Sequence, residues 1–299
     1  MFDKEKVFLG IAPIGWCNDD MPELGAENTF RQTVSEMALA GFTGCEIGNK
    51  YPKDPAVLKK ALQMRGMRIA SRWYSSFLLT RPFEEEAADF LANLDFLAAV
   101  GANRINVSEQ SGSIQGKDVP VLTGAHKPVM DDRQWDRFCD GLNRLGALAS
   151  DRGFRLCYHH HMGTVVQTSE ETDRMMAHTN ERYVFLCYDT GHFTFAGEDP
   201  LAMLKKYAGR IGHVHLKDMR LDVVAKAREN RWSFLQAVRN GAFTVPGDGD
   251  VDFDPVFAAL AEAGYTGWLL VEAEQDPAPA DPLEYAIKAR KYIREHTGL

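Results

Sequence analysis

Eight short apolar runs alternate with longer amphipathic stretches, and this alternation constrains the fold of the 299-residue chain more than any other feature. The runs are rich in Val, Ile, Leu and aromatic residues, as expected for strands that are buried on both faces. They are Val7–Ala12, Thr43–Ile47, Arg68–Trp73, Asn103–Val107, Phe154–His159, Tyr183–Tyr188, Ile211–Leu216 and Trp268–Val271. Alternation of strands with helices predicts a parallel sheet, and eight such units predict an α/β fold of the (β/α)8 TIM-barrel type.

Helical patterns lie between most of these runs. Asn28 is a good N-cap for a helix over 29–40 that ends before Gly41. Three glutamates in the first turn favour a helix over 83–100, because they complement the helix dipole. Further helices are expected over 133–152, 169–177, 199–206, 255–262 and 282–296. An open doubly wound sheet is the rival fold, but no Gly-x-Gly-x-x-Gly follows the first run, which disfavours it.

Two long connections leave the C-terminal ends of expected strands. One extends from Ser108 to Asp132, and the other from Lys217 to Phe253, where we expect no strand and one short helix near Ser233–Val238. Loops of this length are usually functional, and barrel active sites form at this end. Since no linker or repeat is visible, we expect residues 1–299 to form a single barrel domain with a long loop after strand seven.

Composition narrows the class of protein. The net charge of −8 disfavours nucleic acid as a partner, and no apolar run is long enough to span a membrane. The N-terminus lacks a signal-peptide pattern, so we expect a cytoplasmic protein. The five cysteines include no Cys-x-x-Cys pair, and three of them (Cys45, Cys157 and Cys187) lie in apolar runs. We expect buried, reduced thiols.

Six of the nine histidines lie at or just past the ends of expected strands. They are His159, His160, His161, His192, His213 and His215. We expect His159 and His161 to share a face, and only one of His213 and His215 to face the barrel axis. Imidazole together with carboxylate suits Mn, Co, Fe, Zn or Ni better than Mg or Ca. The pattern therefore predicts a divalent-metal site with an open position for substrate.

Carboxylates end other strands of the same set. Asp189 directly follows the sixth run, and Glu272 and Glu274 follow the eighth. Each has a structural interpretation, since Asp189 could cap a helix and the two glutamates could be solvated rim residues. Because these carboxylates and the histidines lie at the same ends of the expected strands, a shared metal site is favoured.

Several motifs together resemble the xylose-isomerase-like barrel superfamily, which contains sugar epimerases, sugar isomerases and type-IV apurinic endonucleases. The motifs are Asp189-Thr190-Gly191-His192, His213-Val214-His215-Leu216-Lys217-Asp218, Pro246-Gly247-Asp248-Gly249, Gly264-Tyr265-Thr266-Gly267 and Val271-Glu272. Within it, the chain is similar to the inosose dehydratase family. That similarity rests on the segments 10–16 with Asn18-Asp19, 71–74, 158–164 and 241–249.

The resemblance implies a hydro-lyase that converts 2-keto-myo-inositol (scyllo-inosose) to 3D-3,5/4-trihydroxycyclohexane-1,2-dione in myo-inositol catabolism. It implies Mn or Co as the metal, glutathione as a cofactor and a homo-oligomer. The superfamily uses four metal ligands, Glu, Asp, His and Glu, and Asp189, His215 and Glu272 match the last three. At the position of the first Glu this chain has His159, with His161 two residues on. Either could be the fourth ligand, and a site with three protein ligands is the alternative.

Elimination of water needs one base and one acid. As a hypothesis, Glu272 is the base, and His192 or Lys217 is the acid or a substrate contact. Candidate substrate-binding residues are Trp16, Asn18, Trp73, Glu109 and Arg220. The two tryptophans could instead plug the mouth of the barrel.

Three other functions compete with the dehydratase. A ketose epimerase or isomerase is disfavoured because epimerases of the superfamily use a metal-bound carboxylate on each side of the substrate, and one is replaced here by His159. A type-IV endonuclease would need a basic groove, whereas the chain is acidic. A non-catalytic, metal-dependent polyol-binding protein stays open, since fold does not determine function.

Overall fold

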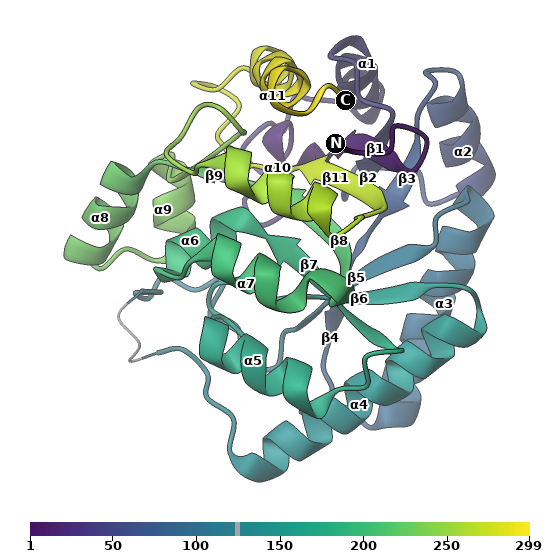
Figure 1. Ribbon diagram of the computed structural model, residues 1–299, viewed down its shortest axis with the longest axis vertical. Helices are drawn as coiled ribbons and strands as arrows, with labels where there is room; N and C mark the ends of the chain where they lie inside the picture. The colour runs from purple at the N-terminus through teal and green to yellow at the C-terminus, as the bar shows by residue number, and fades with distance from the viewer. Residues whose placement is uncertain (123–125) are drawn as a thin grey trace.

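A parallel sheet of nine strands forms the centre of the protein (Figure 1). The structure is a computed structural model and describes residues 1–122 and 126–299. The strand order is β3-β2-β1-β11-β8-β7-β6-β5-β4. The strands are β1 (Val7–Ile11), β2 (Gly44–Glu46), β3 (Arg68–Ser71), β4 (Trp73–Ser76), β5 (Arg104–Glu109), β6 (Arg155–His159), β7 (Val184–Asp189), β8 (Ile211–Leu216) and β11 (Gly267–Val271).

The two ends of this strand order are consecutive in the chain, and this closes the barrel. Only Arg72 separates β3 from β4, and its carbonyl oxygen accepts a hydrogen bond of 2.9 Å from the backbone N–H of Asn106. β3 and β4 therefore form one long strand, which pairs with β2 through its first half and with β5 through its second, and the third predicted run covers it only as far as Trp73. The predicted (β/α)8 barrel is confirmed.

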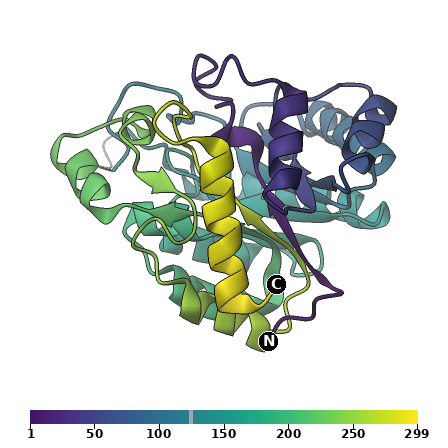
Figure 2. The same ribbon diagram turned by 90° about the horizontal axis from the view of Figure 1, so that it is seen from above.

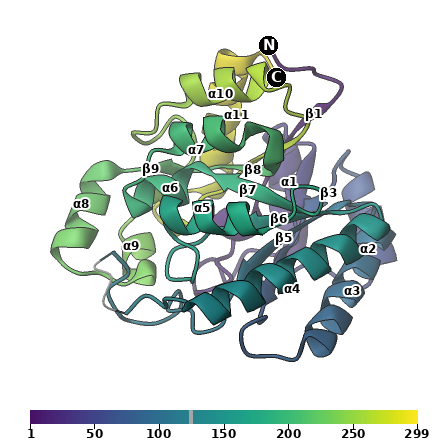
Figure 3. The ribbon, with the colours of Figure 1, turned by 60° about the horizontal axis from the view of Figure 1, so that its bottom comes forward.

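Helices surround the barrel on its outer face (Figures 1 and 3). They are α1 (Phe30–Leu39), α2 (Pro55–Gln63), α3 (Phe83–Val100), α4 (Asp132–Asp151), α5 (Ser169–His178), α7 (Pro200–Tyr207), α10 (Phe253–Glu262) and α11 (Pro282–Thr297). The N-cap of α1 is Thr29, whose hydroxyl accepts from Gln32 N–H, and Asn28 instead donates to the carbonyl of Trp16. Helix α2 was not predicted, although Asp54 caps it and Pro55 occupies its first position.

The long connection after β8 is more ordered than predicted. The expectation of no strand was wrong, because β9 (Asp218–Met219) pairs with β10 (Phe243–Thr244) in an antiparallel ribbon. Helices α8 (Leu221–Glu229) and α9 (Phe234–Arg239) lie between them and project from one side of the barrel (Figure 1). The short helix expected near Ser233–Val238 is α9. Apolar side chains of this segment form a second core that includes Phe234 and Phe243.

Asp218 holds this segment in place. Its carboxylate accepts backbone N–H groups from Gly247, Gly249 and Val251 at 2.9–3.0 Å. A Cβ at Gly249 would lie 2.5 Å from Oδ1 of Asp218, so only glycine fits here. The Pro-Gly-Asp-Gly motif thus closes a loop around one carboxylate.

The other long connection, from Ser108 to Asp132, contains residues 123–125, which lie outside the described residues. Its Val121 N–H donates to the carbonyl of Trp232, so the two long connections meet at the same end of the barrel. The two termini lie side by side at the edge of the barrel (Figures 2 and 3). All five cysteines are buried free thiols, as predicted. In the described ranges, every helix is too short or too polar to cross a bilayer.

Candidate metal and active site

Histidine and carboxylate side chains from five strands meet at one end of the barrel. His159 is the last residue of β6, Asp189 the last residue of β7, and His215 lies in β8. Glu46 ends β2, and Glu272 directly follows β11. Parallel strands in a barrel end at the same face, which is why residues so distant in sequence converge.

Three of these residues, Glu46, His215 and Glu272, border a cavity of about 330 Å³. Four residues predicted for the site lie in its wall: Trp73, His161, His215 and Glu272. The other lining residues are Ala12, Pro13, Ile14, Asp19, Asp20, Glu46, Ile47, Gly48, Asn49, Arg72, Ser75, Asn106, Gln115 and Glu274. A cavity of this size suits a small ligand, and its polar wall suits one that carries several hydroxyl groups.

Asp189, His215 and Glu272 form the centre of the candidate metal site. Nδ1 of His215 lies 2.7 Å from Oε2 of Glu272 and 3.4 Å from Oδ2 of Asp189. Yet this buried nitrogen makes no hydrogen bond with any described residue. Close approach without a hydrogen bond is what ligands of a common ion show, and one nitrogen with two carboxylates is a donor set for a transition metal. The residues present therefore fit a divalent ion.

The two candidates for a fourth ligand occupy different surroundings. Nε2 of His159 lies 3.2 Å from Oδ2 of Asp189, whereas His161 groups with His192 and Glu274. Both imidazoles contact the edge of Trp73. The geometry favours His159 as the ligand nearest to the Asp189 centre.

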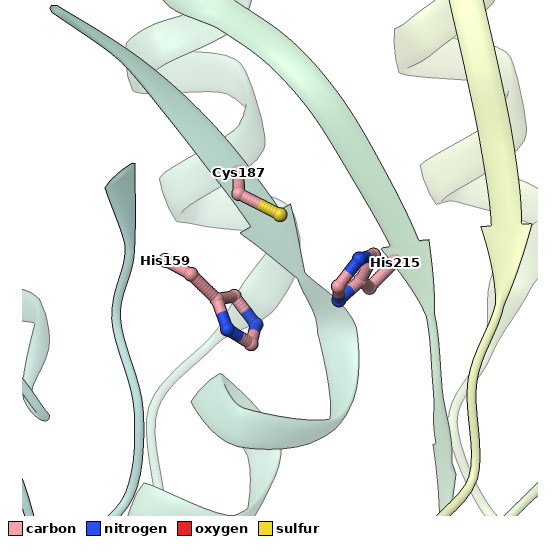
Figure 4. A group of neighbouring side chains, drawn as sticks. All are labelled: His159, Cys187 and His215. Carbon is pink, nitrogen blue, oxygen red and sulfur yellow. The ribbon is translucent and has the colours of Figure 1, made fainter. Parts of the chain in front are cut away.

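Cys187 lies beside the same centre, two residues before Asp189 on β7. Figure 4 shows its sulfur above the space between the imidazoles of His159 and His215, which extend toward each other from β6 and β8. One potential ligand atom from each of the three lies within 4.8 Å of the others. Burial raises the pKa of the Cys187 thiol to about 11. It therefore keeps its proton at neutral pH and is a poorer ligand than Asp189.

Lys217 is a buried cation among the carboxylates. Its Nζ lies 2.9 Å from Oε1 of Glu272, 2.9 Å from Oε2 of Glu274 and 3.4 Å from Oδ2 of Asp189. Burial would lower the pKa of Lys217, but these carboxylates raise it above its ordinary value. The lysine therefore stays charged and offsets their negative charge.

The two glutamates after β11 have different environments. Burial would raise the pKa of Glu272, but His215 and Lys217 outweigh it and bring the pKa to about 2. Burial raises the pKa of Glu274 to about 7. Pairs of acids whose pKa values are separated in this way are typical of acid–base sites. His192 lies close to Glu274 and Lys217. Its Nε2 is 3.8 Å from Oε1 of Glu274 and 3.0 Å from Nζ of Lys217.

Glu46 was missed by the sequence analysis. Its Oε1 lies 3.0 Å from Nε2 of His215 and 3.2 Å from Nε2 of His213. The signal was present, because Glu46 is a carboxylate at the end of a predicted strand, just as Asp189 is. The expectation that only one of His213 and His215 faces the axis was wrong, since residues two apart on a strand point to the same face.

Four predicted substrate contacts lie apart from the cavity wall. Trp16 is 1% exposed and its indole N–H donates to Glu36, while Asn18 accepts two backbone N–H groups in its own turn. Glu109 accepts hydrogen bonds from Ser76 and nearby backbone N–H groups, and Arg220 pairs with Asp248. Their hydrogen bonds hold loops together, and the structure does not bring these side chains to the cavity.

The chain matches known proteins over its whole length. The model of the xylose isomerase-like TIM barrel family matches residues 34–296. The chain is 61% identical to an inosose dehydratase of Geobacillus thermodenitrificans, with 100% of both chains covered. It is 59% identical to an inosose dehydratase of Clostridium beijerinckii, again over 100% of both chains.

Solved structures show the same fold at low identity. The IOLI protein with a bound zinc atom superposes with a TM-score of 0.72 at 15% identity, covering 97% of this chain and 98% of that one. A probable 3-DHS dehydratase of Bacillus anthracis superposes with a TM-score of 0.71 at 13% identity, covering 96% and 98%.

Proposed function

Because this chain belongs to the inosose dehydratase family of xylose isomerase-like TIM barrels, we propose that it is a hydro-lyase acting on 2-keto-myo-inositol. The reaction removes water and yields 3D-3,5/4-trihydroxycyclohexane-1,2-dione in myo-inositol catabolism. The observation that carries the proposal is the cluster of Asp189, His215 and Glu272, two of which line a polar cavity of about 330 Å³.

The proposed metal ligands are Asp189, His215, Glu272 and His159. A divalent ion held there would polarise the carbonyl of the substrate as a Lewis acid. We propose Mn or Co, because imidazole and carboxylate ligands suit both. Glutathione belongs to the proposal by family resemblance alone, and no step of the elimination is assigned to it.

The wall of the cavity supplies the contacts for a ring that carries hydroxyl groups. Trp73 offers an aromatic face or edge, and Asn106 and Gln115 offer amide groups. Asp19 and Arg72 also line the cavity and can accept and donate hydrogen bonds. These residues replace Trp16, Asn18, Glu109 and Arg220 as the proposed substrate contacts.

Proton transfer is assigned to the two glutamates after β11. A base removes the proton α to the carbonyl, and an acid protonates the β-hydroxyl, which leaves as water. We assign Glu272 as the base, because it is ionised and lines the cavity. We assign Glu274 as the acid, because it also lines the cavity, whereas the earlier candidates His192 and Lys217 are fully buried behind it. Those two residues position Glu274. The enol left by elimination tautomerises to the dione.

An epimerase is the rival function on this fold. Removal and return of a proton on opposite sides of a substrate uses two carboxylates, and His159 occupies the position of one of them. Elimination needs a single base, so the loss of that carboxylate is compatible with a dehydratase. We further propose that the protein is a cytoplasmic homo-oligomer whose partner is its small-molecule substrate, without nucleic acid or membrane.

The test is an assay of metal-stripped protein with 2-keto-myo-inositol, followed by ultraviolet absorbance of the product. We expect product only after Mn or Co is added, and none from an Asp189→Asn variant under the same conditions. Metal-bound protein that forms no dione would overturn the proposed function. Conversion of a ketose to its epimer by the same metal-loaded protein would instead indicate an epimerase.

A further inference from the structure

We infer that Glu46 is a positioning residue that fixes the tautomer and orientation of His215, so that Nδ1 of this imidazole is available to a metal ion. The inference rests on the proposed metal site and extends it beyond the ligands. It concerns a residue in β2, which β1 and β11 separate from β8 in the sheet, 169 positions from His215 in the sequence.

The first step is the hydrogen bond between the two side chains. Nε2 of His215 lies 3.0 Å from Oε1 of Glu46. A carboxylate accepts but does not donate when ionised, so Nε2 of His215 must carry the proton. In a neutral imidazole the other nitrogen then has a free lone pair. That nitrogen, Nδ1, is the atom that lies 2.7 Å from Glu272 and 3.4 Å from Asp189.

The second step is that Glu46 is itself held rigidly. Its Oε1 accepts hydrogen bonds from the hydroxyl of Ser71 and from Nδ2 of Asn106, the latter at 2.7 Å. His213 approaches the same oxygen through Nε2 at 3.2 Å. Three hydrogen bonds to one buried oxygen, from Ser71, Asn106 and His215, hold the carboxylate in one orientation. A fixed acceptor of this kind restricts rotation of the His215 ring.

The third step distinguishes this role from direct metal binding. Oε1 of Glu46 already takes part in three hydrogen bonds, and it faces Nε2 of His215 rather than Nδ1. Asp189 and Glu272, which would hold the metal, lie on the Nδ1 side of the ring. Carboxylates that hydrogen-bond the outer nitrogen of a metal-binding histidine commonly raise metal affinity 10- to 100-fold.

Calorimetric titration of metal-stripped full-length protein with Mn²⁺ tests the inference without substrate. We expect Glu46→Gln and Glu46→Ala to bind Mn²⁺ about 10- to 100-fold more weakly than wild type. Glu86→Gln is the control, because Glu86 is a fully buried carboxylate that pairs with Tyr74 and Arg81 outside the site. This control should bind Mn²⁺ as wild type does. Affinity within twofold of wild type in both Glu46 variants would overturn the inference.

Nitrogen-15 NMR of the zinc-loaded protein gives a second readout. We expect the ring of His215 to be protonated at Nε2 in wild type, and to lose the slow exchange of this proton in Glu46→Ala. Protonation at Nδ1 in the wild-type protein would contradict the inference even if the affinities change. Three results can fail separately. Binding of Mn²⁺ by wild type tests the metal site, and turnover of 2-keto-myo-inositol by wild type tests the proposed function. The ratio of Mn²⁺ affinities between the Glu46 variants and wild type tests the role of Glu46.

Discussion

The ammonium group of Lys217 lies 2.9 Å from Oε1 of Glu272, and neither side chain can be solvated as it would be at the surface. Glu274 and Asp189 lie within 3.4 Å of the same nitrogen. One buried cation therefore offsets three buried carboxylates. A buried charge that loses its partner is strongly destabilising, and this makes Lys217 a sensitive position.

Substitution of Lys217 by Met should lower the free energy of unfolding by about 3–5 kcal/mol, because the carboxylates lose their buried counter-charge. Urea unfolding of metal-stripped protein measures the change. Lys226→Met is the control, since Lys226 pairs with Asp222 on the surface and should cost less than about 1 kcal/mol. Equal losses in the two variants would show that Lys217 has no special electrostatic role.

Removal of the metal should lower thermal stability. With free Mn²⁺ at about 100 times its dissociation constant, the folded state gains about 2.7 kcal/mol. A chelator should remove this gain, and Asp189→Asn should not show it at the same concentration, because a central ligand is lost. Asp222→Asn, an exposed change, should keep the full effect. Thermal unfolding with and without Mn²⁺ measures both, and a metal-induced shift of wild-type size in Asp189→Asn would refute the ligand assignment.

Glu274→Gln should reduce kcat by about 10²- to 10⁴-fold, the usual contribution of a positioned acid or base. Its affinity for Mn²⁺ should change only a few-fold, because Glu274 lies outside the Asp189–His215–Glu272 centre. Steady-state kinetics at saturating metal provide the measurement. Glu284→Gln, at the exposed start of α11, is the matched control. A kcat within threefold of wild type would remove Glu274 from the chemistry.

The two tryptophans should respond differently to substitution. Trp73 lines the cavity, so Trp73→Phe should raise KM by about 10-fold, equivalent to about 1.4 kcal/mol. Trp16 is buried and bonded to Glu36, so Trp16→Phe should lower the free energy of unfolding by about 1–2 kcal/mol and leave KM unchanged. Kinetics and urea unfolding of both variants separate the two roles. The opposite pattern would place Trp16 in the substrate site.

Buried thiols should make the protein less stable at alkaline pH. Burial raises the pKa of Cys157 to about 12, whereas an unfolded thiol ionises near pH 8.5–9. Unfolding therefore releases a proton between these values, and the free energy of unfolding falls as pH rises, by up to about 1.4 kcal/mol per pH unit for this thiol. Cys157→Ala should show a shallower fall between pH 9 and 11 when both proteins are unfolded in urea with reductant. Parallel slopes would contradict the prediction.

Much of the fold was predictable because it depends on local patterns. Apolar runs at strand spacing and amphipathic stretches between them predict eight strand–helix units whatever their partners are. The elements that were not predicted also have local explanations. Helix α2 had its cap at Asp54, and the two-residue strands β9 and β10 are too short to produce a pattern.

Residue types at the predicted strand ends also specify which chemistry the site can hold. Asp189, His215 and Glu272 each lie at or next to the C-terminal end of a buried strand, and parallel strands of a barrel must bring such residues together. Which neighbours complete the site depends on how distant strands and loops pack together. Glu46 meets His215 across the closed barrel, and Trp16 and Arg220 turn to Glu36 and Asp248 instead of the cavity. Spacing along one strand specifies the face of a side chain, but contacts between distant strands and loops depend on how the whole barrel closes.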